Sequence, residues 1–234
     1  MQSYLQRLQQ DLAARRQASL LRAPKVVNSP CSAEVIVDGE SLLTFCSNDY
    51  LGLANHSALK KAFAKAADQW GVGSGSAHLV TGHCSLHQQL EEALAEFTGY
   101  SRALLFSSGY MANLAMLNAL TAKGDAVFQD KLNHASLLDS GQLMPARMLR
   151  YVHADVGSLS RQAATVSAQQ RFVVTDGVFS MDGDIAPLDE LVPLADNQDM
   201  VLMVDDAHGL GVLGERGRGS IEHFSLASHQ VPVL

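Results

Sequence analysis

The sequence predicts an α/β protein built on a mostly parallel sheet with helices on both faces, and two observations favour this class. From His87 onward, segments with helical periodicity alternate with short apolar segments, as in sheets whose parallel strands are joined by helices. Residues 201–212 begin as a continuous apolar run, typical of a buried strand, and end in two carboxylates, a histidine and glycines. Because open α/β sheets bind ligands at the carboxyl ends of their strands, this stretch indicates the candidate site.

The first 70 residues predict local elements that precede this alternation. Leu5, Leu8 and Leu12 share one face of an N-terminal helix. Two apolar segments, residues 35–37 and 42–45, flank the pair Asp38-Gly39, which is a strong signal for a hairpin turn. A turn-rich stretch follows, and residues 58–70 predict a second helix.

Beyond them, the pattern predicts five strands joined by helices. Helices are expected at residues 87–97, 110–120 and 188–197, after His134, and between the third and fourth strands. The expected strands are residues 102–106, 126–129, 148–152, 171–175 and 200–205. The glycine-rich residues 71–76 do not fit a dinucleotide-binding loop, because they lack the G-x-G-x-x-G spacing and no strand precedes them. Their glycines would instead let the backbone approach a ligand or partner closely, and both interpretations stay open.

Composition excludes several classes of protein. The 234 residues are 47% hydrophobic, enough for a substantial core, and no apolar run reaches the length of a membrane span. A formal net charge of −7 argues against nucleic-acid binding. The N-terminus lacks a signal-peptide pattern, and three widely spaced cysteines predict reduced thiols rather than disulfides or a metal site. These features predict a cytoplasmic protein without nucleic-acid, membrane or metal partners.

Polar residues follow four of the five expected strands. Ser107-Ser-Gly-Tyr110 opens a helix, whose free N–H groups suit an anion. The other three strand ends carry Asn133-His134, residues 176–180, and the pair Asp205 and His208. Each has a simpler explanation, because serines often cap helices and a lone histidine is more often a surface residue. Their shared position at one edge of the sheet favours a common site.

Asp205 and His208 suggest which ligand that site binds. An ionised aspartate can hold a protonated pyridine nitrogen while a histidine contacts the ring hydroxyl, as in pyridoxal phosphate (PLP) sites. A similar sequence occurs in the Mg²⁺-binding strand of helicase-type ATPases. Such ATPases also require a G-x-x-x-x-G-K-[ST] phosphate-binding loop, which this sequence lacks. The third alternative is that the acids cap a turn. On this stretch alone, turn and site are equally favoured.

Six motifs in a fixed order carry a family resemblance. They resemble those of the α-oxoamine synthases, a branch of the PLP enzymes with the aspartate aminotransferase fold (PLP fold type I), over essentially the whole chain. The resemblance implies PLP as cofactor, a homodimer, a small-domain segment at residues 1–55 and an incomplete PLP-binding large domain at residues 56–234. The motifs are Ser47-Asn-Asp-Tyr-Leu-Gly-Leu53, Gly73-Ser-Gly-Ser76, Leu105-Phe-Ser-Ser-Gly109, Asn133-His-Ala-Ser136, Thr175-Asp-Gly-Val-Phe-Ser-Met-Asp-Gly183 and Val204-Asp-Asp-Ala-His-Gly209.

The resemblance also implies roles for single residues. Asp205 would pair with the pyridine nitrogen, His134 would stack on the ring, and His208 would contact the ring hydroxyl; these three are the expected catalytic residues. Substrate contacts are expected at Arg22, Asn48 and His134. The expected cofactor-binding residues are Ser108, Gly109 and Tyr110 near the phosphate, together with His134, Asp176, Ser180, Asp205 and His208; relatives often carry glutamate at position 176.

Within this branch, the motifs resemble most the members that condense L-alanine with a pimeloyl thioester, either pimeloyl-ACP or pimeloyl-CoA, in biotin biosynthesis. Residues 47–50, the loop 73–82 and the sequence Asp-Asp-Ala-His-Gly carry this preference. The nearest alternative is the group that condenses glycine with acetyl-CoA. A short form that binds a partner subunit without catalysis is a third hypothesis.

One expected residue has no counterpart in the sequence. Enzymes of this family need a lysine that holds PLP covalently and moves the substrate's α-proton. The resemblance places it after the strand that follows residue 234, and none of the six lysines, of which Lys131 is the last, occupies that position. The expectation is therefore that the chain is the N-terminal part of a longer enzyme, and that the 234 residues alone have no synthase activity.

Overall fold

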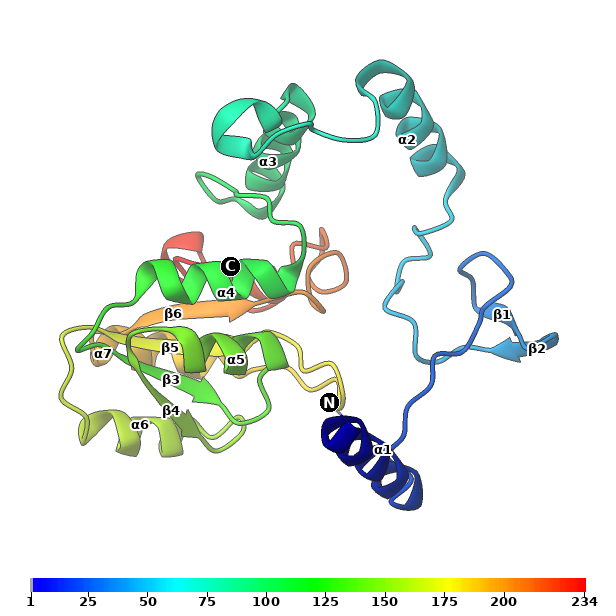
Figure 1. Ribbon diagram of the computed structural model, residues 1–234. Coiled ribbons are helices and arrows are strands. Elements are labelled where there is room, and N and C mark those ends of the chain that lie inside the picture. Colours follow the sequence, from blue (N-terminus) through cyan, green and yellow to red (C-terminus); the bar gives the residue numbers. More distant parts are fainter. Residues whose placement is uncertain (1) are drawn as a thin grey trace. The chain divides into compact units, whose positions relative to one another are not determined.

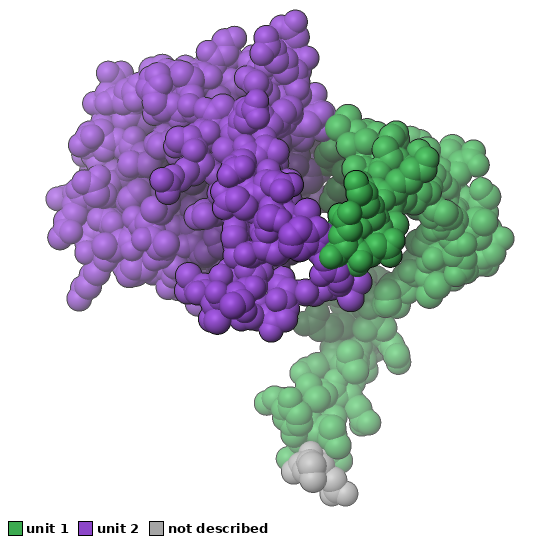
Figure 2. Space-filling view, turned by 90° about the horizontal axis from the view of Figure 1, so that it is seen from above, with its two compact units in different colours: residues 1–69 green, residues 70–234 purple. Residues whose placement is uncertain are grey.

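The structure is a computed structural model that describes residues 2–234, and it divides into two compact units, Met1–Gln69 and Trp70–Leu234 (Figure 2). In the first unit, α1 (Gln2–Gln17) confirms the predicted N-terminal helix. The strands β1 (Glu34–Val37) and β2 (Glu40–Leu43) pair antiparallel and confirm the hairpin. Asp38 and Gly39 form its turn with φ of 53° and 85°, which is the left-handed backbone that a two-residue turn requires.

Helix α2 (Ser57–Trp70) confirms the helix predicted at residues 58–70. The leucines that predict α1 remain exposed, with 38% of Leu8 and 53% of Leu5 accessible. The assignment of residues 1–55 to a small domain and of residues 56–234 to a large one stays a prediction.

The second unit contains a four-stranded parallel sheet, which confirms the predicted fold class (Figure 1). Its strands are β3 (Ala126–Asp130), β4 (Arg147–Tyr151), β5 (Arg171–Asp176) and β6 (Val201–Asp205), in the order β4-β3-β5-β6. At the β6 edge, Val233 makes a parallel bridge to Met203 and accepts a 3.0 Å hydrogen bond from the Val204 amide.

Helices cover both faces of this sheet, as the sequence predicts. On one face, α4 (Gly109–Leu120) and α5 (Ala135–Leu143) contribute Leu117 and Leu137, which pack with the strand residues Val127, Val174 and Met203. On the other face lie α6 (Val156–Ala164) and α7 (Leu188–Asn197), which pack against the alternate strand residues, among them Phe128, Val173 and Leu202. Successive side chains of a strand point to opposite faces, so the apolar runs fill both layers.

The predicted strand at residues 102–106 is wrong. The segment is irregular, and among the described residues no strand lies beside it to complete a hydrogen-bonded ladder. The Leu105 amide instead donates to the Glu91 carboxylate at 2.9 Å, and 78% of Leu104 is exposed. A strand needs a neighbour for its backbone groups, and the local apolar pattern does not supply that information.

The remaining elements are short apart from one helix. Helix α3 (Ser85–Thr98) confirms the predicted helix at residues 87–97 and ends at Gly99, which adopts φ 78°. A π-helical turn (His78–Gly82), α8 (Ser220–His223) and a 3₁₀ turn (Ser228–Gln230) complete the unit. In the part of the chain that the structure describes, no helix combines the length and the apolar character needed to cross a membrane.

Candidate functional site

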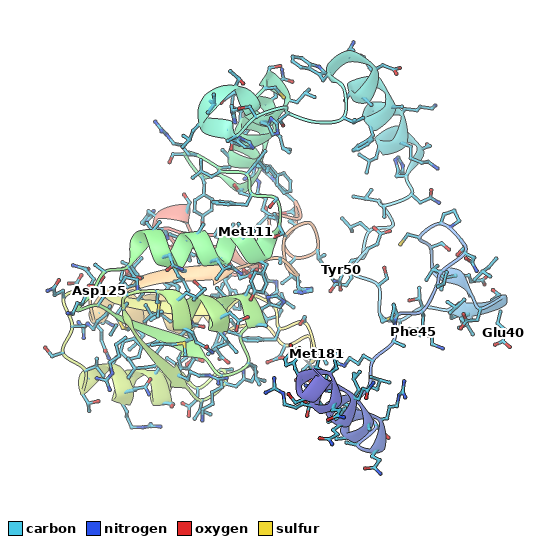
Figure 3. The ribbon with its side chains drawn as sticks, in the orientation of Figure 1. Glu40, Phe45, Tyr50, Met111, Asp125 and Met181 are labelled. Atoms are coloured by element: carbon cyan, nitrogen blue, oxygen red, sulfur yellow. The ribbon has the colours of Figure 1, made fainter. Side chains whose placement is uncertain are left out.

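The polar residues gather where the parallel strands end. Met111 of α4 and Met181 of the loop after β5 lie toward the edge at which the strand arrows end, whereas Asp125, which precedes β3, lies toward the opposite edge (Figure 3). Because β3, β5 and β6 are neighbours and parallel, the loops after them emerge side by side. The start of α4 faces the same edge (Figure 1).

Asp205, the last residue of β6, is held by two donors. The amide of Asn113 on α4 donates to Asp205 Oδ2 at 2.6 Å, and the backbone N–H of Ala207 donates to Oδ1 at 3.1 Å. The same Asn113 nitrogen also donates to the Ser136 hydroxyl on α5 at 2.8 Å. One buried amide thus joins α4, α5 and β6 and orients the Asp205 carboxylate.

Asn113 is a residue that sequence reasoning missed. It lies in the middle of α4, whose sequence GYMANLAMLNAL is otherwise mostly apolar, and it is 8% exposed. Asparagine is unfavourable inside a helix, because its amide competes for backbone hydrogen bonds. The signal available in the sequence was therefore an asparagine within an otherwise apolar helix.

The loop after β3 is fixed to β5 by Asn133. Its side-chain amide donates to the Val174 carbonyl at 2.9 Å, and its side-chain carbonyl accepts from the Asp176 amide at 3.0 Å. The next backbone N–H, that of His134, donates to both oxygens of the Asp176 carboxylate at 3.1 and 3.2 Å. The structure therefore joins His134 and Asp176, two of the predicted cofactor-binding residues.

The His134 ring is oriented by its role as N-cap of α5. Its Nδ1 accepts from the Ser136 amide at 3.3 Å and lies 2.7 Å from the Ser136 hydroxyl. The residue is exposed, so its side chain is accessible at the sheet edge. Capping and a role in binding are compatible, because the cap uses Nδ1 alone.

Two buried acids at this edge are perturbed. The pKa of Asp176 is raised to about 7, mainly by burial; the hydrogen bond from His134 opposes the shift, and the negative charges of Asp205 and Asp130 add to it. Burial also raises the pKa of Asp206, against the opposing bonds from Ser220. Neighbouring carboxylates and little water thus make this edge a poor place for uncompensated negative charge.

Asp206 anchors the turn rather than facing a ligand. Its Oδ2 accepts from the Ser220 amide at 2.8 Å. A Cβ on Gly177, Gly209 or Gly219 would approach its carboxylate to 2.4, 2.2 or 1.8 Å, so glycine is required at all three positions. Of the two adjacent aspartates, Asp206 is thus the one that fits the turn interpretation.

The N-terminus of α4 offers the predicted anion site. Ser108 is its N-cap and accepts from the Met111 amide at 3.3 Å. A Cβ on Gly109 would meet no atom within 4 Å, so the backbone there is open to a ligand. The Tyr110 hydroxyl donates to the Asp139 carboxylate on α5, and this bond raises the pKa of Tyr110. All three residues are exposed, and the free N–H groups of the first turn can bind phosphate oxygens.

The other predicted site residues are less directly connected. Ser180 is exposed in the loop that begins at Asp176. His208 is half-buried in the next turn, in which the Gly209 amide donates to the Asp206 carbonyl at 3.0 Å. Arg22 and Asn48 belong to the first compact unit, and their contact with substrate stays a prediction. The cofactor and catalytic roles of all these residues likewise stay predictions.

Comparisons with known proteins identify relatives of this chain. An 8-amino-7-oxononanoate synthase of Methylococcus capsulatus is 60% identical over 210 residues, which cover 90% of this chain and 54% of that protein. The chain therefore spans only about half the length of that relative. Among solved structures, the 8-amino-7-oxononanoate synthase of Francisella tularensis is 38% identical with a TM-score of 0.66, covering 79% of this chain and 50% of that one.

A second solved structure is a serine palmitoyltransferase of S. paucimobilis with bound PLP–myriocin aldimine. It is 30% identical with a TM-score of 0.89, and the match covers 98% of this chain and 58% of that one. The family model for aminotransferases of class I and II matches residues 40–232. With this match over most of its length, the chain belongs to the aminotransferase class I and II family.

Proposed function

We propose that this chain supplies most of the PLP site of an 8-amino-7-oxononanoate synthase, which condenses L-alanine with a pimeloyl thioester. The products are 8-amino-7-oxononanoate, CO₂ and the free thiol: the α-carbon of alanine, after losing its proton, replaces the thiol on the acyl carbon, and the alanine carboxylate then leaves as CO₂. The observation that carries the proposal is the oriented Asp205 carboxylate beside the open N-terminus of α4. Identity of 53–60% to relatives of that name supports this choice of substrates.

The residues at the carboxyl edge fit PLP in their chemistry. The cofactor carries a phosphate, a ring hydroxyl and a pyridine nitrogen. Ser108, Gly109 and Tyr110 at the start of α4 would bind the phosphate through free N–H groups and hydroxyls. Asp205 would accept a hydrogen bond from the protonated ring nitrogen, and its two existing donors keep it oriented for that.

When bound, PLP supplies an electron sink for the negative charge that forms at the amino acid's α-carbon. Asp205 favours this by keeping a proton on the ring nitrogen. His134, whose Nδ1 is occupied by the α5 cap, would cover one face of the ring, while His208 and Ser180 would contact the ring hydroxyl. Asp176 would act indirectly, because it holds the His134 backbone.

The substrate contacts are further proposals. Arg22 and Asn48 would bind the carboxylate or acyl groups, since they are a cation and an amide in an exposed stretch of the first unit. A homodimer, a cytoplasmic location and the choice between pimeloyl-CoA and pimeloyl-ACP complete the proposed function.

The test uses protein produced from the complete reading frame that encodes this chain. Purified protein is incubated with PLP and either L-alanine plus a pimeloyl thioester or glycine plus acetyl-CoA, and CO₂ and thiol release are measured. We expect thiol and CO₂ in equal amounts with the first pair. Faster reaction with glycine and acetyl-CoA would replace the substrate assignment, and PLP binding without either reaction would favour a non-catalytic role.

A further inference from the structure

A third histidine at the carboxyl edge lies between two carboxylates. His153 follows β4, with its Nδ1 2.9 Å from Asp130 Oδ1 and its Nε2 2.5 Å from Asp184 Oδ2. The ring also packs edge-on against Phe179, with ring centroids 4.4 Å apart and planes at 87°. Both nitrogens are thus engaged, and the ring cannot rotate without losing all three contacts.

The two carboxylates belong to different loops. Asp130 ends β3, is 1% exposed, and also accepts from the amides of Leu132 and Ala154 at 2.8 Å. Its loop continues directly to Asn133 and His134. The Asp130 carboxylate therefore joins the loop after β3 to the loop after β4.

Asp184 closes the loop after β5. Its carbonyl accepts from the Phe179 amide at 2.9 Å, and the Gly183 amide donates back to the Phe179 carbonyl at 2.8 Å. Residues 180–182 form the tip of this loop and are exposed. The contact from His153 Nε2 to Asp184, together with the ring contact to Phe179, connects this closed loop to the loop after β4, across the strand β3 that lies between β4 and β5.

We propose that His153, as a doubly protonated imidazole, is a positioning residue that clamps the loop bearing His134 to the loop bearing Ser180. Two carboxylates demand two N–H donors, and neutral imidazole has only one. The charge also fits, since one cation between two anions relieves repulsion in an edge already crowded with acids. The functional half of this inference rests on the proposed PLP site, whereas the protonation state does not.

The electrostatic surroundings of His153 agree with this geometry. Burial alone would lower the pKa of His153, but the hydrogen bonds to Asp130 and Asp184 and their negative charges outweigh it and raise the pKa. The charged groups in contact with the ring are thus the carboxylates of β3 and of the loop after β5, and the remaining ring contact, Phe179, is uncharged.

The first experiment is independent of activity. Protein from the complete reading frame, free of PLP and labelled with ¹⁵N in histidine, is examined by NMR at pH 7, and resonances are assigned by His153→Asn and His223→Asn. His223 is the matched control, because it is exposed and packs edge-on against Phe224 without a carboxylate contact. We expect two slowly exchanging ring N–H signals for His153 and none for His223. A single N–H on His153 would overturn the clamp, whatever reaction the protein catalyses.

The second experiment measures positioning. His153→Asn should weaken PLP binding and lower kcat by roughly tenfold to a hundredfold. Without the clamp, His134 and Ser180 would move from the positions in which they contact the cofactor, and small displacements of such groups reduce the rate strongly. His223→Asn should leave both unchanged. Asp184→Asn, a milder change in a partly exposed residue, should reproduce the loss, and the double variant should be no worse than His153→Asn alone.

A merely structural role predicts a different result. In that case His153→Asn would lower Tm while PLP affinity and kcat per folded molecule stayed unchanged, and the positioning role would be overturned. Additive losses from His153→Asn and Asp184→Asn would equally overturn it, because the two residues would then act separately. PLP affinity is measured on the same samples, so a failure of the proposed reaction would be seen separately from a failure of the clamp.

Discussion

The two edges of the parallel sheet use buried aspartates in opposite ways. At the amino edge, Asp125 is 5% exposed, and each of its oxygens accepts a backbone N–H, from Ala122 at 2.8 Å and from Gln170 at 3.1 Å. At the carboxyl edge lie Asp130, Asp176, Asp205 and Asp206, and burial raises the pKa of two of them. Asp130 and Asp206 also accept backbone N–H groups, so the difference lies in the crowding: an aspartate at the amino edge is a satisfied turn anchor, whereas those at the carboxyl edge belong to an acid cluster.

This difference indicates that the ligand binds at the carboxyl edge. Turn chemistry accounts for one buried aspartate whose oxygens are both occupied, but four neighbouring carboxylates repel each other and need compensating positive charge. His153 supplies part of that charge through Asp130. A protonated pyridine ring at Asp205 would supply more, so the proposed cofactor fits the electrostatics of the carboxyl edge.

The largest predicted effect is the loss of turnover when Asp205, at the carboxyl edge, is replaced. Asp205→Asn should retain PLP but lose about two orders of magnitude in turnover, because a neutral partner no longer favours a protonated ring and a pairing worth about 3 kcal/mol is lost. The measurement is alanine-dependent CO₂ release at saturating PLP, using protein from the complete reading frame. Near-normal turnover would mean that Asp205, like Asp125, is only a turn residue.

The matching change at the amino edge should affect stability instead. Asp125→Ala removes a buried carboxylate that accepts from the amides of Ala122 and Gln170, and the loss of these two hydrogen bonds to a charged group should lower the free energy of unfolding by about 3 kcal/mol. Turnover per folded molecule should stay normal. Urea unfolding monitored by circular dichroism measures the first quantity, and loss of turnover without loss of stability would show that the edges are not functionally distinct.

Local pattern was sufficient to predict most of the helices and strands in both units. The helices on both faces, the four strands of the sheet and the hairpin turn at Asp38-Gly39 follow from periodicity and turn chemistry that act over a few residues. Residues 102–106 could not be predicted in the same way, because strand formation depends on a partner distant in sequence. Their apolar pattern alone does not provide one.

Long-range contacts also explain what was missed at the site. Polar residues were identified at four strand ends, but not after β4, where His153 lies. Its partners Asp130 and Asp184 are 23 and 31 residues away, so no spacing rule joins them. Asn113 and Asp205 are 92 residues apart, and only the packing of α4 on β6 brings the amide to the carboxylate.

The acid cluster should also be visible in the pH dependence of stability. The pKa of Asp176 is about 7 in the folded protein, whereas an aspartate in the unfolded chain has its ordinary value of 3.8, so the folded state binds more protons between these limits. The free energy of unfolding should therefore decrease as pH rises from about 4 to about 7, by at most about 1.4 kcal/mol per pH unit for this group. Urea unfolding of PLP-free protein at several pH values measures this slope.

Two variants test the origin of that slope. Asp176→Asn should remove the contribution, while Asp205→Asn should shift it to lower pH, because a neighbouring negative charge no longer raises the pKa of Asp176. Asp125→Asn at the other edge should leave the slope unchanged. An unchanged slope in Asp176→Asn would show that the acid cluster does not control this titration.

The smallest predicted effect compares two helix caps. Ser108→Ala at α4 and Asp155→Ala at α6 each remove a side chain that accepts from a first-turn amide, Met111 at 3.3 Å and Ser158 at 2.7 Å. Each should lower the free energy of unfolding by about 1 kcal/mol. Only the start of α4 is proposed to bind the cofactor phosphate. Only Ser108→Ala should therefore weaken PLP binding and reduce the ability of inorganic phosphate to compete with PLP. Equal changes of PLP affinity in both variants would mean that capping itself, rather than a phosphate contact, links α4 to the site.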